Sequence, residues 1–163
     1  MKKYDEILLD INNVVKAFKI PSEKLFSSKK RIFALDGISF KLRYGESFGI
    51  VGESGSGKST LARTIMGLDI PQSGEIIFMG KDIHSLNPKD LRRTRKSLQM
   101  IFQDPYGSLD PKQTINKIVS EPLSLFGGIQ PFHKKDKVLY TLDKVGLSPN
   151  DLNKYPQNYL SVI

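Results

Sequence analysis

The order of hydrophobic and polar positions predicts strands first and helices later. Residues 38–42 alternate apolar with polar side chains, as in a strand that is buried on one face. Short apolar runs predict further strands over 7–18 and 75–79. The runs 47–51 and 98–102 are almost entirely apolar, which is typical of parallel strands buried on both faces.

The helical signals follow a glycine-rich run and fill the C-terminal half. Apolar residues recur with helical spacing over 59–68, 114–126 and 134–145. An Asn-Pro pair before residues 89–96 is typical of an N-cap followed by a first-turn proline, and it predicts a basic helix there. Strands early, helices late and one strand–loop–helix unit between them predict an α/β nucleotide-binding fold.

Composition narrows the classes of function. The 163 residues carry 25 Lys and Arg against 17 Asp and Glu, a net charge of +8, and no Cys. No apolar run is long enough to cross a bilayer, and the lack of cysteine excludes disulfide scaffolds and thiolate chemistry. The basic run 89–96 is either a nucleic-acid patch or a solvated helix face, and it lacks interleaved aromatic residues. His84 and His133 are too few for a His-rich metal site and are expected at the surface.

Residues 52–59 read Gly-Glu-Ser-Gly-Ser-Gly-Lys-Ser and match the phosphate-loop pattern G-x-x-x-x-G-K-[ST]. The glycines let backbone N–H groups approach phosphate oxygens, and the helix that follows adds its positive end. Lys58 is expected to reach the β- and γ-phosphates, Ser59 to ligate Mg²⁺, and Thr60 to assist at the α-phosphate. The pattern alone does not separate ATP from GTP, or a kinase from a mechanical ATPase. The candidate nucleotide-binding residues of this loop are Gly52, Glu53, Ser54, Gly55, Ser56, Gly57, Lys58, Ser59 and Thr60.

Two motifs together resemble a known family. The loop in its context, residues 48–63, resembles the phosphate loop of ATP-binding cassette (ABC) transporters. Residues 100–111, Met-Ile-Phe-Gln-Asp-Pro-Tyr-Gly-Ser-Leu-Asp-Pro, are similar to the Q-loop of the oligopeptide, dipeptide and nickel import subfamily. The resemblance covers residues 7–156.

The resemblance implies an α/β fold of the P-loop NTPase class. The expected architecture is an ABC-type nucleotide-binding domain, with an antiparallel β subdomain and a RecA-like core, that stops before the signature motif. The whole of 1–163 is then one incomplete domain. Residues 1–80 hold the N-terminal strands and the phosphate loop, and residues 81–163 hold the Q-loop and the start of the helical subdomain.

The resemblance also assigns two residues outside the phosphate loop. Gln103 would place its amide oxygen near Mg²⁺ and the attacking water, where the subunit meets its membrane partner; without the phosphate loop it reads as a plain turn residue. Phe18 would stack on adenine, and its alternative is a core or strand-edge residue. The implied cofactors are ATP and Mg²⁺, with Ser59 and Gln103 as metal ligands.

The function implied is that of the ATP-binding subunit of an importer for oligopeptides or dipeptides. Its partners would be transmembrane permease subunits and a second ABC subunit. The chain would lie peripherally on the cytoplasmic face of the cell membrane. The basic helix would then lie close to that membrane or to a helical protein partner instead of nucleic acid, and a solvated helix face stays the simplest interpretation of it. Peptide, nickel or another substrate is not readable from these residues.

Several family motifs are absent from the sequence. The L-S-G-G-Q signature, the buried strand ending in Asp-Glu and the switch histidine have no match, although Tyr155-Pro156 fits the lead-in to the signature. Residues 138–143 imitate a strand ending in Asp, but their spacing fits a helix better. We therefore expect ATP binding without hydrolysis by this chain alone, whether it derives from a frameshifted gene, a natural truncation or a fragment. The alternatives are a non-catalytic nucleotide-binding module that docks on a permease or partner cassette, and a small P-loop kinase.

Overall fold

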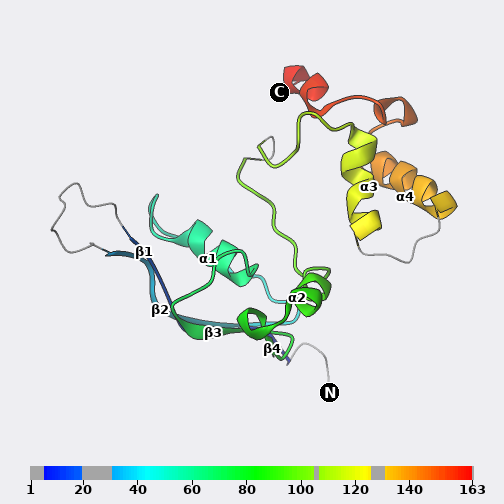
Figure 1. The fold of residues 1–163 in the computed structure, drawn as a ribbon. Coiled ribbons are helices and arrows are strands. Elements are labelled where there is room, and N and C mark those ends of the chain that lie inside the picture. The colour runs from blue at the N-terminus through cyan, green and yellow to red at the C-terminus, as the bar shows by residue number, and fades with distance from the viewer. Residues whose placement is uncertain (1–5, 20–30, 105–106, 126–130, 163) are drawn as a thin grey trace. The chain divides into compact units, whose positions relative to one another are not determined.

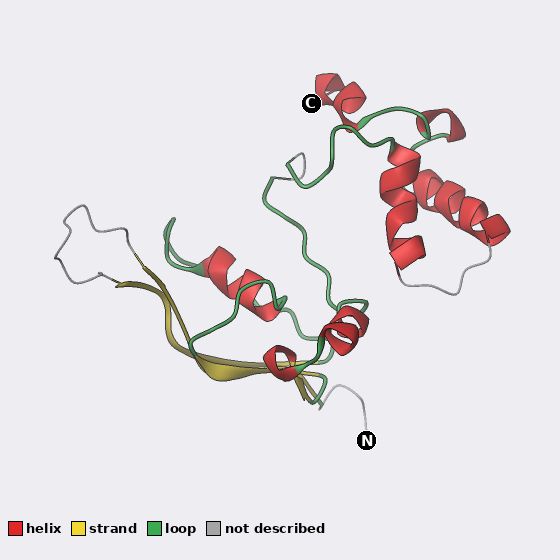
Figure 2. Ribbon diagram, viewed as in Figure 1, coloured by secondary structure: helices red, strands yellow, loops and turns green. Residues whose placement is uncertain are grey.

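The computed structural model describes residues 6–19, 31–104, 107–125 and 131–162. The chain forms two compact units, residues 1–100 and 101–163. The division into residues 1–80 and 81–163 made above stays a prediction. Figure 1 and Figure 2 show strands in the first unit and helices without strands in the described part of the second.

The first unit is built on one antiparallel sheet of four strands in the order β2-β1-β3-β4. The strands are β1 (Ile7–Lys19), β2 (Arg31–Arg43), β3 (Ser73–Phe78) and β4 (Lys81–Asp82). Helix α1 (Lys58–Ile65) lies over one face of this sheet (Figure 1), and the short η2 (Ile83–Ser85) and α2 (Pro88–Thr94) follow β4. The buried core combines both layers and contains Leu9, Ile11, Val14, Leu35, Leu61, Ile76, Phe78 and Ile83.

The second unit is a small helical assembly. It contains α3 (Ile115–Leu125), α4 (Pro131–Lys144) and the 3₁₀ turns η3 (Pro149–Asp151) and η4 (Pro156–Val162). The segment after α4 caps α3, because the amides of Ile115 and Asn116 donate to the carbonyls of Lys154 and Leu152. A buried cluster of Ile115, Val138 and Leu142 holds the helices together.

Most of the predicted elements are confirmed, including the strand 38–42 within β2 and the Asn87 N-cap of α2. Asn87 Oδ1 accepts a hydrogen bond from the Asp90 amide at 3.0 Å. Residues 138–143 lie inside α4, so the helix interpretation of that segment is confirmed over the strand one. No described helix has the length and apolar character that crossing a bilayer requires.

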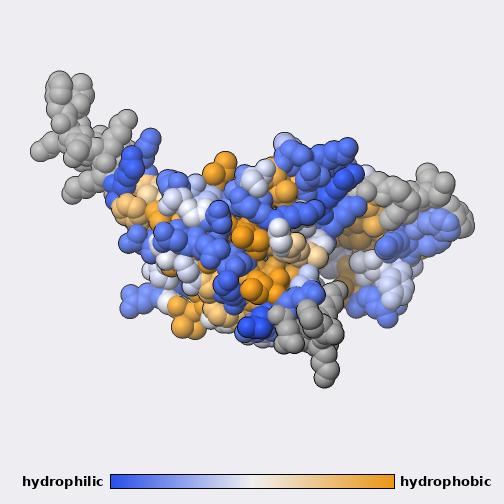
Figure 3. Space-filling model, turned by 90° about the horizontal axis from the view of Figure 1, so that it is seen from below, coloured by the Kyte–Doolittle hydropathy of each residue, from blue (hydrophilic) through white to orange (hydrophobic). Residues whose placement is uncertain are grey.

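The two expected parallel strands are wrong for this structure. Residues 47–51 and 98–102 have no strand conformation, and Val51 and Ile101 are each 95% exposed. A strand forms only when its backbone groups pair with a neighbour, and no described residue pairs with either segment. Phe48 instead stacks on Phe40 of β2, with ring centroids 4.7 Å apart. Figure 3 shows one face of the molecule, where apolar side chains lie open among hydrophilic ones.

The basic run after Pro88 divides into a structural residue and exposed ones. Helix α2 ends at Thr94, before the predicted end at residue 96. Arg95 then turns toward α1 and donates to the carbonyl oxygens of Met66 and Gly67, at 3.3 Å and 3.0 Å. These carbonyls follow the end of α1, where a cation is stabilising. The exposed bases of the run are Lys89, Arg92, Arg93 and Lys96.

The expectation for the histidines holds for one of them. His133 is exposed on α4, but His84 is half-buried and its Nε2 lies 3.0 Å from the carbonyl oxygen of Thr64. Thr64 itself is fully buried in α1. His84 therefore ties η2 to the helix that follows the phosphate loop, a contact that its polar sequence neighbours did not indicate.

Asp151 holds the turn after α4, and it makes the helical unit sensitive to acid. Its carboxylate accepts hydrogen bonds from Lys154 Nζ at 2.6 Å, from the Ser148 amide at 2.6 Å and from Ser148 Oγ at 2.8 Å. These bonds, that of Lys154 first, hold the pKa of Asp151 well below its ordinary value. The unfolded chain then binds the proton more tightly than the folded one, so this contribution to the free energy of unfolding is complete above the ordinary Asp pKa of about 4 and is lost progressively as the pH falls from there toward the lowered pKa.

Asp151→Asn should therefore lower the unfolding temperature of the helical signal at neutral pH and flatten its fall in acid. Thermal unfolding followed by circular dichroism at a series of pH values measures both. Asp136→Asn, at an exposed position of α4, is the matched control and should keep the wild-type profile. Equal acid sensitivity in Asp151→Asn and the wild type would contradict the assignment.

Candidate phosphate-binding site

The glycine-rich loop lies between β2 and the start of α1, in the first unit. Gly57, at the N-cap of α1, has a backbone φ of +91°, in the left-handed region. A Cβ there would lie 2.0 Å from the carbonyl oxygen of Ala34 and 3.4 Å from a methyl carbon of Leu35. The loop thus crosses β2 in direct backbone contact, and glycine is the residue that fits at this crossing.

The side chain of Lys58 fills the centre of this loop. Its Nζ donates to the carbonyl oxygens of Gly52 and Glu53, at 2.7 Å and 2.6 Å, and lies 3.2 Å from Ser56 Oγ. Within the loop backbone, the Ser56 amide donates to the Glu53 carbonyl at 3.2 Å and closes a turn. The loop therefore closes around the Lys58 ammonium, whose three donors are all used by loop oxygens, and a phosphate would replace some of these partners.

The start of α1 adds further groups that suit an anion. The first turn of the helix holds no acidic residue, and Gly57 provides no side-chain cap. Its leading amides are therefore unneutralised, as at the helix N-termini that bind phosphate. Ser59 is exposed and its hydroxyl has no hydrogen-bond partner within the described residues, so a hard oxygen donor is available to a divalent cation such as Mg²⁺. Thr60 is half-buried in the same turn.

Phe18 lies on β1, close to where the loop crosses the sheet. Leu35, which the loop contacts, pairs with Lys16, and Phe18 follows two residues later opposite Ile32. The Phe18 side chain is 45% exposed, so part of it is open to solvent. The structure therefore brings this predicted base-stacking residue near the predicted phosphate-binding residues.

Sequence reasoning missed Lys16 beside this ring. The Lys16 ammonium lies 5.4 Å from the centroid of the Phe18 ring, a cation–π distance. Residues two apart in a strand share a face of the sheet. That spacing was the signal that could have found Lys16.

Gln103 belongs to the second unit, whereas the phosphate loop belongs to the first. It is exposed at a bend, and the next residue, Asp104, accepts a hydrogen bond at Oδ1 from the Gly107 amide at 3.1 Å. Its role toward water and Mg²⁺ stays a prediction.

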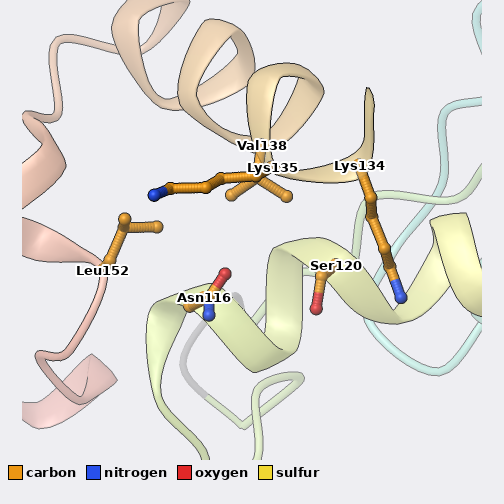
Figure 4. Close-up of a pocket in the computed structure, with 6 residues that line it drawn as sticks. All are labelled: Asn116, Ser120, Lys134, Lys135, Val138 and Leu152. Atoms are coloured by element: carbon orange, nitrogen blue, oxygen red, sulfur yellow. The ribbon is translucent and has the colours of Figure 1, made fainter. Parts of the chain in front are cut away.

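Each unit also has an open hollow. The one in the first unit, about 440 Å³, borders the phosphate loop at Ser56 and Lys58, but most of its lining is apolar and comes from β2 and residues 48–51. The one in the second unit, about 290 Å³, lies between α3 and α4 (Figure 4). None of the site residues predicted from the sequence lines it: its lining consists of Asn116, Ser120, Lys134, Lys135, Val138 and Leu152.

Comparison with known proteins agrees with this geometry. The family model described as ABC transporter matches residues 35–162, which include the phosphate loop, Gln103 and every helix of the described residues. The chain belongs to the ABC transporter family. The antiparallel sheet with the phosphate-loop helix over it is accordingly part of an ABC nucleotide-binding domain, which confirms the predicted fold class.

Among curated relatives of this ABC chain, the oligopeptide transport ATP-binding protein OppF of Haemophilus influenzae is 43% identical over 157 residues. The oligopeptide transport ATP-binding protein AppF of Bacillus subtilis and the glutathione import ATP-binding protein GsiA of Escherichia coli are each 41% identical. Each match covers 94% of this chain. The predicted resemblance to the oligopeptide and dipeptide import subfamily is thus confirmed. The chain spans 47% of the length of OppF and AppF and 25% of GsiA.

Solved ABC cassettes share the fold. The dimeric cassette MJ0796, in a post-hydrolysis state bound to ADP and phosphate, superposes with a TM-score of 0.73 and 27% identity, covering 91% of this chain and 62% of that one. CbiO1 of Clostridium perfringens gives a TM-score of 0.65 at 25% identity, covering 93% of this chain and 55% of that one. ABC cassettes thus bind nucleotide and form dimers, as MJ0796 does.

Proposed function

We propose that residues 1–163 form the nucleotide-holding part of the ATP-binding subunit of an ABC importer for oligopeptides or dipeptides. The single observation that carries this proposal is the phosphate loop closed around Lys58 at the start of α1. The names of OppF, AppF and GsiA support the import of peptide-like substrates.

The chain's own groups suit the polyphosphate of ATP. Lys58 and the amides at the start of α1 would neutralise phosphate charge, and Phe18 would stack on adenine without reading its hydrogen-bonding edge. The residues that would hold Mg²⁺ are Ser59 and Gln103, and the ion would supply charge neutralisation at the phosphates. Phosphoryl transfer depends on positioning and charge stabilisation, and no apolar strand run in this sequence ends in an Asp-Glu pair that would polarise the attacking water.

The partners proposed for the intact importer are permease subunits and a second ABC subunit, with the assembly peripheral on the cytoplasmic face of the membrane. The dimer of MJ0796 supports the pairing of two cassettes. The exposed bases after Pro88 are compatible with an anionic membrane surface close by. A binding module that docks on a permease or partner cassette without catalysis is the second candidate, and the missing Asp-Glu strand favours it for this chain alone.

ATP binding and ATP turnover by the purified chain test the proposal together. We expect saturable, Mg²⁺-dependent ATP binding in calorimetry, and phosphate release no faster than in buffer. Adding a complete ABC subunit separates the two candidates, because release above that of the added subunit alone would show that this chain contributes to catalysis. No ATP binding would overturn the proposed function, and turnover by the chain alone at the rate of full cassettes would overturn its non-catalytic part.

A further inference from the structure

Gln72 directly precedes β3 and extends the hydrogen bonding along β1 past the first residue of β3. Strand β3 begins at Ser73, which pairs with Val15, and the Gln72 amide donates to the Val15 carbonyl at 2.8 Å. Beyond that point the Gln72 side chain continues the pairing. Its Oε1 accepts from the Ala17 amide at 2.7 Å, and its Nε2 donates to the Ala17 carbonyl at 3.0 Å.

A side-chain amide has the same donor and acceptor pair as a peptide group. The two bonds of Gln72 therefore replace the residue that a longer β3 would offer to Ala17. On its other side this part of β1 pairs with β2, Ala17 opposite Phe33 and Phe18 opposite Ile32. The backbone that leads into Phe18 is thus held from both edges.

The same segment also holds the cation beside the ring. Lys16 Nζ donates to the Ile70 carbonyl at 2.6 Å while lying 5.4 Å from the centroid of Phe18. Residues 70–72 therefore fix both the backbone before Phe18 and the ammonium group near its ring.

This segment is anchored in turn on the phosphate-loop helix. Arg63, in the last turn of α1, donates to the Asp69 carboxylate at 2.8 Å, and its carbonyl accepts from the Leu68 amide at 2.9 Å. A continuous chain of bonds thus runs from α1 through residues 68–72 to Phe18. The helix that starts at the phosphate loop and the ring predicted to contact the base are positioned by one segment.

We propose that Gln72 is a positioning residue for the nucleotide base: its amide holds β1 at Ala17 so that the Phe18 ring is presented to a planar purine. The inference rests on the proposed function, since it needs a nucleotide whose phosphates occupy the loop. Gln72 acts through Phe18 and does not itself contact the ligand. It contributes to the share of affinity that depends on the base, and not to the share that depends on phosphate.

The test compares ATP with inorganic tripolyphosphate, which has the phosphates and no base. Gln72→Ala should weaken ATP binding about three- to tenfold and leave tripolyphosphate binding unchanged. The expected loss is a part of the contribution of base–aromatic stacking, which is roughly tenfold or greater in affinity. Gln99→Ala is the matched control, because Gln99 is exposed in the same unit and donates to Arg95 instead of to β1. It should leave both affinities at the wild-type value.

A double-mutant cycle shows whether Gln72 acts through the ring. In a Phe18→Leu background, Gln72→Ala should cause no further loss of ATP affinity. The sequence has no Trp, so Phe18→Trp also introduces a single tryptophan, whose fluorescence reports on this position. Its emission should change on adding ATP but not tripolyphosphate, and Gln72→Ala should reduce that change.

The outcomes separate this inference from the function on which it rests. If the wild type binds neither ATP nor tripolyphosphate, the proposed function fails. If it binds both, but Gln72→Ala weakens them equally or its effect adds to that of Phe18→Leu, the positioning role fails and the phosphate site stands. An unchanged ATP affinity in a folded Gln72→Ala protein would also overturn the positioning role.

Discussion

Lys58→Ala should weaken ATP binding by about 100-fold or more. A hydrogen bond to a charged group contributes roughly 1.5–3 kcal/mol, and every 1.4 kcal/mol is about tenfold in affinity. The phosphate-loop pattern predicts such bonds from Lys58 to two phosphates, in exchange for its present bonds to the Gly52 and Glu53 carbonyls. Calorimetry with ATP and Mg²⁺ measures the loss.

The control for this substitution is Lys89→Ala, which removes an exposed lysine of α2 in the same unit and should keep the wild-type affinity. The unliganded loop must also be checked, since Lys58 holds the carbonyls of Gly52 and Glu53 when no phosphate is present. Circular dichroism shows whether the Lys58→Ala protein is folded. If the folded variant binds ATP within threefold of the wild-type affinity, Lys58 is excluded as the phosphate-binding cation.

Gly57→Ala should destabilise the first unit by about 3 kcal/mol or more and abolish ATP binding. A non-glycine residue in the left-handed region costs about 1–2 kcal/mol by itself. The added Cβ would also lie 2.0 Å from the Ala34 carbonyl, so the loop must leave β2. Denaturant unfolding of the variant and the wild type measures the difference.

Gly55→Ala is the matched control for this clash. Gly55 has a similar positive φ of +83°, but a Cβ there would meet nothing within 4 Å. It should therefore cost only the backbone term, about 1–2 kcal/mol. Equal losses for the two variants would show that contact with Ala34 is not what fixes the loop.

Local patterns predicted the elements whose formation is decided locally. The alternation in residues 38–42 and the helical spacing in 114–126 and 134–145 correspond to β2, α3 and α4. The strand predicted over 47–51 was wrong. An apolar run shows that a strand there would need to be buried on both faces, but it does not show whether a neighbouring strand is present to pair with it. Its backbone remains unpaired among the described residues, whatever its composition favours.

The contacts that sequence reasoning missed join residues far apart in the chain. Arg95 reaches Met66 and Gly67, and Gln72 reaches Ala17 across a separation of 55 residues. Such contacts leave no periodic pattern in the sequence, because an Arg or Gln side chain that makes none of them would fit an exposed surface equally well. The phosphate loop was readable for the opposite reason, because its residue types are fixed by the shape of one ligand group.

The unpaired segment 47–51 also has a consequence for the abundance of this polypeptide in a cell. Val51 is 95% exposed in the folded state, and the side chains of the nearby Phe48 and Ile50 are also exposed. Chaperones and proteases recognise exposed apolar chain segments without secondary structure, which folded domains mostly bury. Residues 1–163 on their own display it at all times. Their steady-state abundance would then be governed by degradation and chaperone capacity, and a partner that covered the segment would raise it without any change in synthesis.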